Sequence, residues 1–204
     1  MRKIDKGTEP KELTQWKRRY PKDKNYESLT PVERQAIKRV CINEQFGLCA
    51  YCCKKVTENN SMNEHVEARA LAPNRALDFS NMVASCTTRG QCDNAHKNQV
   101  LPLTPLMSAC ETELKFNMSG KVKGLTERAQ ISIEVLKLNN RDIQEQRKQI
   151  LDDLLFPDEA NDLKLLEDEL LQILIDELTQ RNSEMQLQAF SPVLVNIVKQ
   201  FIKA

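Results

Sequence analysis

The sequence contains few glycines, and their spacing excludes the common nucleotide-binding loops. Five of the 204 residues are glycine, at positions 7, 47, 90, 120 and 124. They form neither the G-x-G-x-x-G nor the G-x-x-x-x-G-K pattern, in which backbone amides surround a phosphate group. This sequence therefore has no P-loop with which to bind ATP.

Long apolar runs are also missing. The most apolar stretch, from Leu163 to Leu178, is interrupted by acidic residues such as Glu167 and Asp176 and falls short of the ~20 residues that span a membrane. The first residues, Met1-Arg-Lys-Ile-Asp-Lys, are polar and lack the apolar segment of a secretion signal. We expect a cytoplasmic protein with no membrane partner. In a reducing compartment, its seven cysteines favour metal ligands or free thiols over a disulfide framework.

The formal net charge of +1 conceals a gradient along the chain. Residues 1–60 carry a net charge of +6, whereas residues 125–204 carry −6. A basic first part favours a polyanionic partner such as nucleic acid, and an acidic last part favours a protein partner. Ordinary solvated surface charge is the alternative interpretation.

Helix signals are clearest in the first 47 residues. A short helix is predicted over Lys11–Tyr20, because Pro21 cannot continue it. A second helix should begin after Thr30, which can cap it, with proline next and Glu33 completing a capping box. This helix should continue to about residue 45 and end at Gly47.

The last 80 residues are predicted to be mainly helical. Helical character begins at Leu125, and a helix capped by Asn139 or Asn140 should continue through Leu155. Further helices are expected around residues 163–178 and from Ser191 to about Ile202.

The helix expected at 163–178 has apolar residues on two sides. One side carries leucines at 163, 166, 170, 174 and 178, and the second consists of Leu165, Leu171 and Ile175. This second side either is displayed to a protein partner or completes the core of the chain itself.

Residues 48–100 contain five of the seven cysteines and both histidines. Cys49 and Cys52 form a C-x-x-C turn, and Cys86 and Cys92 form a second pair about 35 residues later. Two such pairs can supply the four thiolates that bind structural Zn²⁺ tetrahedrally. Cys53 could compete as a ligand, whereas Cys41 and Cys110 are expected to pack as small hydrophobic residues.

Both histidines, His65 and His96, fall within the segment that zinc would hold together. An isolated histidine is more often structural than catalytic, but this location favours a functional role. Glu64 directly precedes His65, and Asn94 and Lys97 lie beside His96.

These motifs, in this order, resemble a zinc-containing HNH endonuclease. The matching residues are Cys49-Ala-Tyr-Cys52, Glu64-His65, Asn81-Met-Val-Ala-Ser-Cys86 and Asn94-Ala-His-Lys97. Further segments resemble the PtuB-type HNH proteins, the nuclease subunits of Septu and some retron anti-phage systems: Met1-Arg-Lys-Ile, Gln45-Phe-Gly-Leu, Leu101-Pro-Leu-Thr-Pro105 and Val135-Leu-Lys-Leu-Asn139.

The resemblance implies an α+β fold with a small ββα-metal core. This core, at residues 48–105 with its zinc knuckle, would lie between an N-terminal basic helical segment (1–47) and a larger helical partner-binding region (106–204). Duplex DNA is the favoured substrate, with structured RNA such as tRNA as the alternative.

The resemblance also implies catalytic roles. His65 would act as the general base and Asn81 would orient it, while Glu64 would bind a catalytic Mg²⁺ or Mn²⁺ ion. The second ligand would be Asn94, by its spacing to Lys97, or His96. Helix geometry separates those two side chains by roughly 200°, so both cannot face one ion.

Three basic residues are candidates for phosphate contacts: Lys97, Arg75 and Arg89. The zinc ion would be structural, because four thiolates leave no position for water. The implied partner is an ABC or SMC-like ATPase of the PtuA type, joined in retron systems by a reverse transcriptase and its RNA–DNA product. A non-catalytic zinc knuckle and a thiol redox protein built on residues 49–53 are the alternatives.

Overall fold

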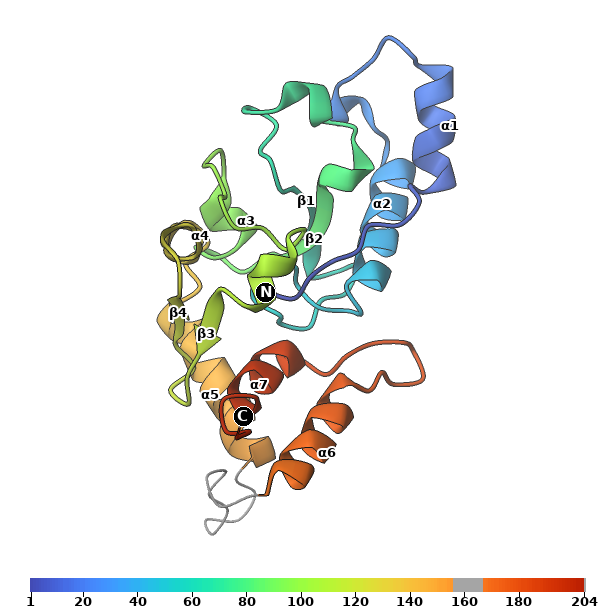
Figure 1. The fold of residues 1–204 in the computed structure, drawn as a ribbon. Coiled ribbons are helices and arrows are strands. Elements are labelled where there is room, and N and C mark those ends of the chain that lie inside the picture. The colour runs from blue at the N-terminus through green and yellow to red at the C-terminus, as the bar shows by residue number, and fades with distance from the viewer. Residues whose placement is uncertain (156–166, 204) are drawn as a thin grey trace.

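The computed structural model describes residues 1–155 and 167–203. It is a mixed α+β fold with seven α-helices and two small two-stranded sheets in the described residues (Figure 1). One cluster of buried hydrophobic side chains includes residues from each of the three expected regions, such as Ile37, Tyr51 and Leu194. None of the described helices has the length and apolarity that crossing a lipid bilayer requires.

The first two helices follow the sequence signals closely. Helix α1 (Lys11–Arg19) ends one residue before the predicted limit, because Tyr20 leaves the helical conformation ahead of Pro21. Helix α2 (Pro31–Glu44) has the predicted capping box. The Thr30 hydroxyl accepts a hydrogen bond from the Val32 amide at 3.3 Å, and the Glu33 carboxylate accepts one from the Thr30 amide at 2.8 Å.

The middle of the chain forms an antiparallel pair of strands followed by a short helix. Strand β1 (Ser61–His65) pairs with β2 (Met82–Cys86), with His65 opposite Met82 and Glu64 opposite Val83. Helix α2 lies against both strands, and α3 (Asp93–His96) follows them in the chain. Glu64 and His65 therefore lie at the end of β1.

The region after residue 105 is less helical than predicted. It contains a hairpin of β3 (Leu114–Phe116) and β4 (Val122–Gly124), which the sequence did not indicate because each strand has only three residues. Helix α4 (Glu127–Val135) then begins after Thr126, whose hydroxyl accepts from the Ala129 amide at 3.3 Å.

Helix α5 (Arg141–Leu155) begins where one of the two predicted caps lies. The Asn140 side chain accepts a hydrogen bond from the Asp142 amide at 3.3 Å. Asn139 is used differently, because its side chain bonds both backbone groups of Val122 in β4.

The last two helices pack against each other. Helix α6 (Asp168–Thr179) contains the second half of the helix expected around residues 163–178, and Leu163, Leu165 and Leu166 lie outside the described residues. Leu171 and Ile175 are buried, so they complete the core and are not displayed as a docking side. Helix α7 (Ser191–Val198) ends four residues earlier than predicted.

Short 3₁₀ helices complete the described elements, at Tyr26–Ser28, Pro73–Arg75, Phe79–Asn81 and Ser108–Glu111.

Candidate functional site

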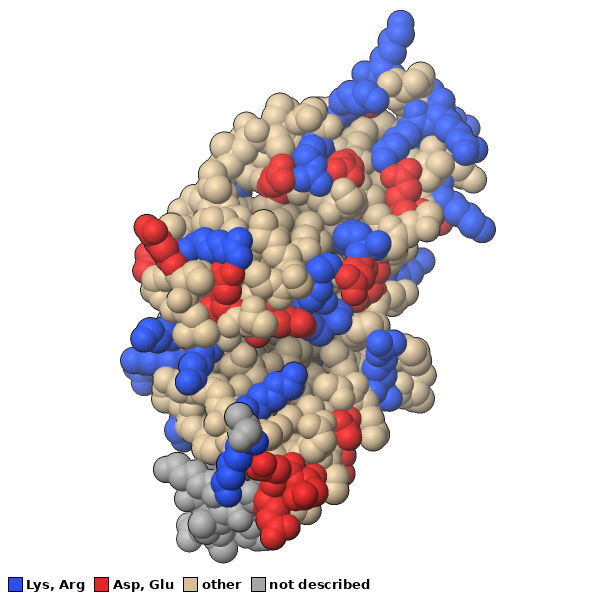
Figure 2. Space-filling view, in the orientation of Figure 1, with Lys and Arg blue, Asp and Glu red and all other residues tan. Residues whose placement is uncertain are grey.

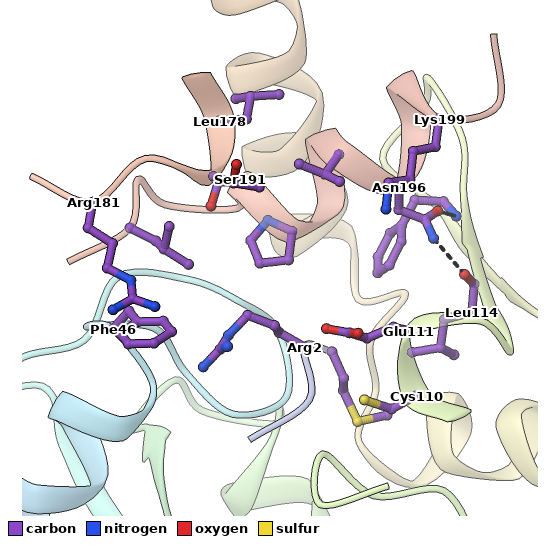
Figure 3. A pocket seen from close by; sticks show the side chains of 16 residues that line it. Arg2, Phe46, Cys110, Glu111, Leu114, Leu178, Arg181, Ser191, Asn196 and Lys199 are labelled. Carbon is purple, nitrogen blue, oxygen red and sulfur yellow. Dashed lines mark hydrogen bonds between the residues drawn. The ribbon is translucent and has the colours of Figure 1, made fainter. Parts of the chain in front are cut away.

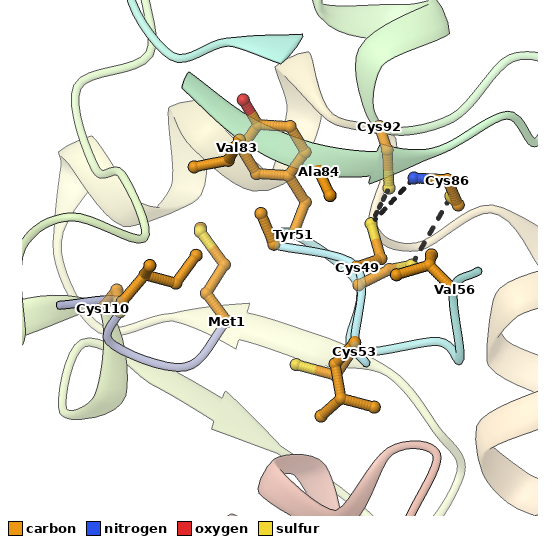
Figure 4. Packing of buried hydrophobic residues seen from close by; sticks show 14 of the residues in the cluster. Met1, Cys49, Tyr51, Cys53, Val56, Val83, Ala84, Cys86, Cys92 and Cys110 are labelled. Atoms are coloured by element: carbon orange, nitrogen blue, oxygen red, sulfur yellow. Dashed lines mark hydrogen bonds between the residues drawn. The ribbon is translucent and has the colours of Figure 1, made fainter. Parts of the chain in front are cut away.

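Four cysteines gather at one point, as the sequence predicted. The sulfurs of Cys49, Cys52, Cys86 and Cys92 all lie within 4.8 Å of one another, and all four side chains are buried. They come from the turn at residues 49–53, the end of β2 and the residue before α3. Figure 4 shows three of the labelled sulfurs facing one another while that of Cys53 points elsewhere.

The sulfur spacing matches tetrahedral metal coordination. Zinc–sulfur bonds of about 2.3 Å place neighbouring sulfurs about 3.8 Å apart in a tetrahedron. The Cys49–Cys92 and Cys52–Cys86 sulfur distances are 3.9 and 3.8 Å. The Cys86 amide also donates a hydrogen bond to the Cys49 sulfur at 3.3 Å, which is favourable for a thiolate. These four buried cysteines could therefore bind a structural metal such as zinc.

The remaining cysteines are buried away from this group. Cys41 and Cys110 have no exposed surface, and burial raises the pKa of Cys41 to about 12 and that of Cys110 to about 11. Both thiols therefore stay protonated and pack as small hydrophobic groups, as expected.

A cleft of about 770 Å³ lies beside the metal cluster, between β1, α2 and α3. Glu64 and His65 of β1 line it, together with Asn94 and Lys97. Four of the residues that the HNH resemblance singled out therefore share one cavity. His96, Asn81, Arg75 and Arg89 do not line it.

His65 is oriented so that one ring nitrogen remains available. Its Nε2 lies 2.9 Å from the carbonyl oxygen of Ala76 and must donate to it, because a carbonyl only accepts. Nδ1 therefore carries the lone pair. The Tyr26 ring packs edge-on against the imidazole, with ring centroids 4.9 Å apart. Burial lowers the pKa of His65 below its usual value, so the ring is neutral at neutral pH.

Asn81 holds the chain just after His65. Its side-chain oxygen accepts from the Glu67 amide at 2.8 Å, and its side-chain nitrogen donates to the Glu67 carbonyl at 3.0 Å. Its backbone carbonyl also accepts from the Val66 amide. Asn81 is fully buried and cannot touch a substrate, so its contribution is to fix the chain that follows the histidine.

His96 is buried behind Glu64. Its Nδ1 lies 2.5 Å from Glu64 Oε1, and its Nε2 donates to the Gln99 carbonyl at 2.9 Å. The Tyr51 hydroxyl donates to the same glutamate oxygen at 3.1 Å. Burial alone would raise the pKa of Glu64, but its hydrogen bonds, foremost that from His96, lower it. Glu64 is therefore an ionised carboxylate held in one orientation.

Asp93 is a cleft residue that the sequence analysis missed. It is the first residue of α3 and lines the cleft beside Glu64. Burial and the nearby Glu64 carboxylate raise the pKa of Asp93 to about 8. The available signal was its position directly after Cys92, at the start of a helix. Its neighbour Asn94 also lines the cleft, and its side-chain oxygen accepts from the Gly90 amide at 2.6 Å.

The cations at the cleft are mostly not those predicted. Only Lys97 of the three predicted residues lines it, joined by Arg34, Lys38 and Arg69. Arg34 and Lys38 lie one turn apart on α2, a spacing that could have indicated a basic helix face.

The other two predicted phosphate contacts lie outside the cleft. Arg75 is paired with Glu67 at 2.6 Å and with Asp78 at 2.8 Å. Arg89 is exposed in the loop before Cys92. Neither therefore contributes to the charge of the cleft wall.

A second cavity, of about 330 Å³, lies between the N-terminal residues and α7 (Figure 3). The guanidinium groups of Arg2 and Arg181 both lie over the Phe46 ring, 4.3 and 3.7 Å from its centroid. None of the predicted site residues lines this cavity.

The surface reflects the charge gradient in part. Figure 2 shows Lys and Arg side chains gathered at the end of the molecule formed by α1, and acidic side chains near α6.

A comparison with known proteins finds no family model and no curated protein that matches this chain.

Proposed function

We propose that the chain is a metal-dependent HNH-type endonuclease that hydrolyses phosphodiester bonds of nucleic acid. One observation carries this proposal. His65, whose Nδ1 carries the free lone pair, lines the same cleft as Glu64, Asp93 and Asn94, and four cations line it as well. A base, oxygen ligands and positive charge in one cavity are what phosphodiester hydrolysis needs.

His65 would accept the proton of the attacking water at Nδ1. It is neutral at neutral pH because burial lowers its pKa, and the Ala76 carbonyl and the Tyr26 ring fix its orientation. Lys97 and Arg69 at the rim would attract the phosphate backbone. His96 would act through Glu64, as a positioning residue.

The donors at the cleft suit a hard divalent ion. The hydrogen bonds from His96 and Tyr51 both end on Oε1 of Glu64. Asp93 and Asn94 add oxygen atoms at the start of α3, and Mg²⁺ and Mn²⁺ prefer such ligands. A bound ion would act as a Lewis acid at the scissile phosphate. Asp93 and Asn94 of α3 line the cleft, whereas His96 is buried, so we favour the first two as ligands of the catalytic ion.

Cleavage assays test this proposal. Zinc-loaded protein with Mg²⁺ or Mn²⁺ should cut nucleic acid. The cleavage rate of His65→Ala should be at least about 100-fold lower, since a general base contributes that much. Zinc content and thermal stability should remain near those of the parent. Glu184→Ala, in the exposed chain before α7, is the control and should cut normally. Parental cleavage by His65→Ala would refute the assignment of the base.

The same assay separates the catalytic proposal from its main alternative. A non-catalytic zinc knuckle needs the four cysteines but not the cleft residues. It would bind nucleic acid or protein without any divalent-dependent cleavage, and its properties would not change in His65→Ala.

Duplex DNA is the proposed substrate, and structured RNA, including tRNA, is the competing one. The chemistry at phosphorus is shared, so the site residues do not distinguish them. Sequencing the cut ends of DNA and RNA incubated with the same protein sample decides between the two.

We further propose that the nuclease works with an ABC or SMC-like ATPase of the PtuA type in anti-phage defence. The sequence resemblance supports this partner, and so does α6, where Leu170 and Ile173 are about half exposed beside acidic residues. Co-purification with the ATPase tests it, and a retron reverse transcriptase with its RNA–DNA product is the possible third component. Loss of the complex in Leu170→Asp would identify α6 as the contact.

A further inference from the structure

Arg147 of α5 is a buried cation without a carboxylate partner. Only 1% of its surface is exposed. Its Nη1 donates to the carbonyl oxygens of Leu138 at 2.7 Å and Gly120 at 3.2 Å, and its guanidinium lies 5.0 Å from the centre of the Phe116 ring. Its Nε and Nη2 find no hydrogen-bond partner among the described residues.

A buried guanidinium lowers the free energy of unfolding unless a negatively charged group lies nearby. A guanidinium remains protonated in proteins, and a buried charge without a counter-charge strongly destabilises a fold. Burial lowers the pKa of Arg147, and the groups that oppose this most strongly are Cys52, Cys53, Cys92 and Cys49, through the negative charge of their thiolate forms. Three of these four belong to the metal cluster.

One short segment connects Arg147 to the cluster. The Cys92 amide donates to the Leu136 carbonyl at 3.0 Å, and two residues later the Leu138 carbonyl accepts from Arg147. The segment at 136–138 thus contacts a cluster cysteine on one side and the guanidinium on the other.

A zinc-loaded cluster would carry net negative charge. Four thiolates around one divalent zinc ion leave two negative charges uncompensated, in a cluster where every side chain is buried. Four neutral thiols, or two disulfides, would leave none.

We propose that Arg147 is the counterion of the four-thiolate metal centre, so that metal loading and the docking of α5 stabilise each other. The inference concerns the metal centre alone and holds whether or not the cleft cuts nucleic acid. It extends the metal site from residues 49–92 to a helix more than fifty residues further along the chain.

Competition for zinc with a chromophoric chelator tests the proposal. In Arg147→Met, which keeps the aliphatic stem but not the charge, the chelator should remove zinc about 10- to 100-fold more readily than from the parent, the usual effect of losing a group that supports metal ligands. Lys148→Met removes the same charge from the next residue, which is exposed and paired with Asp152. This control should retain zinc like the parent.

Arg147→Lys distinguishes charge from hydrogen bonding. If charge matters, the lysine variant should retain zinc much better than the methionine variant. Equal zinc retention in parent and Arg147→Met, or equal losses in Arg147→Met and Arg147→Lys, would overturn the proposal. If Arg147→Met does not fold, Arg147→Gln against Arg147→Lys makes the same comparison, with the Co²⁺–thiolate absorption reporting an intact tetrahedral site.

Discussion

Single atoms decide what the candidate site can do. His65 has a free Nδ1 because its Nε2 is committed to Ala76, and Glu64 is fixed because His96 and Tyr51 both bond Oε1. Asp93 lines the cleft with them, and no motif predicted it. Chemistry at this site therefore depends on hydrogen bonds that the spacing of residues in the sequence does not specify.

The lowered pKa of His65 predicts the acid limb of the cleavage reaction. A base must be deprotonated to act, and burial places this pKa below the usual value of about 6.5. At saturating Mg²⁺, the midpoint of the acid limb of the single-turnover rate should therefore lie below pH 6.5. A midpoint at or above pH 6.5 would contradict His65 as the titrating group.

Asn81→Ala tests whether fixing the chain after His65 matters. The substitution removes both side-chain bonds to the Glu67 backbone and leaves buried groups unpaired, so the free energy of unfolding should fall by about 1–3 kcal/mol. Cleavage should fall while zinc content is retained. Urea unfolding and cleavage rates measure the two effects, with Asn59→Ala, exposed and outside the cleft, as the control. Unchanged stability and cleavage in Asn81→Ala would contradict this role.

The sequence predicted the grouping of the four cysteines and the proximity of Glu64 and His65 to them, because ligand chemistry restricts the residue types at such positions. It did not indicate Asp93, Arg34 or Arg147, because their positions arise from tertiary packing. In the sequence, Arg147 resembles an ordinary exposed helix residue, and only the structure shows that it is buried.

At the scale of elements, helices were predictable wherever a local capping signal exists. Thr30 with Glu33 specifies the start of α2 through contacts within one turn. The strands carry no such signal. All five residues of β2 are buried, so no alternation of apolar and polar residues appears, and β1 is polar in sequence. Only the family resemblance predicted that two strands pair in this region.

Glu113 joins the β3 hairpin to the start of α4, which gives a pH-dependent prediction. The guanidinium of Arg128 and the Thr126 hydroxyl lower the pKa of Glu113 to about 2, from a usual value near 4.5. Because the folded pKa is the lower one, this stabilisation is present above pH 4.5 and is lost as the pH falls toward 2.

Urea unfolding of Glu113→Gln measures this effect. The variant should be less stable than the parent at pH 7, and the difference should shrink below pH 4.5. Glu184→Gln, which is exposed and far along the chain, should match the parent throughout. A parent–variant difference that persists unchanged to pH 3 would contradict the ionic origin.

For the whole molecule, the account predicts that the metal cluster supports both the cleft and the C-terminal helices. Chelation should remove hydrogen-exchange protection from residues 48–100 first, because the four cysteines join the turn at 49–53 to β2 and α3. Helix α5 should lose protection along with them, through Arg147. The basic α1 end, which packs against α2 away from the four cysteines, should be the least affected (Figure 2). Uniform protection with and without metal would contradict this coupling.

The most direct test of the central claim is a Mn²⁺ titration of zinc-loaded protein followed by electron paramagnetic resonance. It requires neither the right nucleic acid nor a partner protein. The account predicts that the cleft binds one Mn²⁺ per chain and that Asp93→Asn and Glu64→Gln weaken this binding while zinc stays in place. Absence of a Mn²⁺ site, or Mn²⁺ binding that both substitutions leave unchanged, would contradict it.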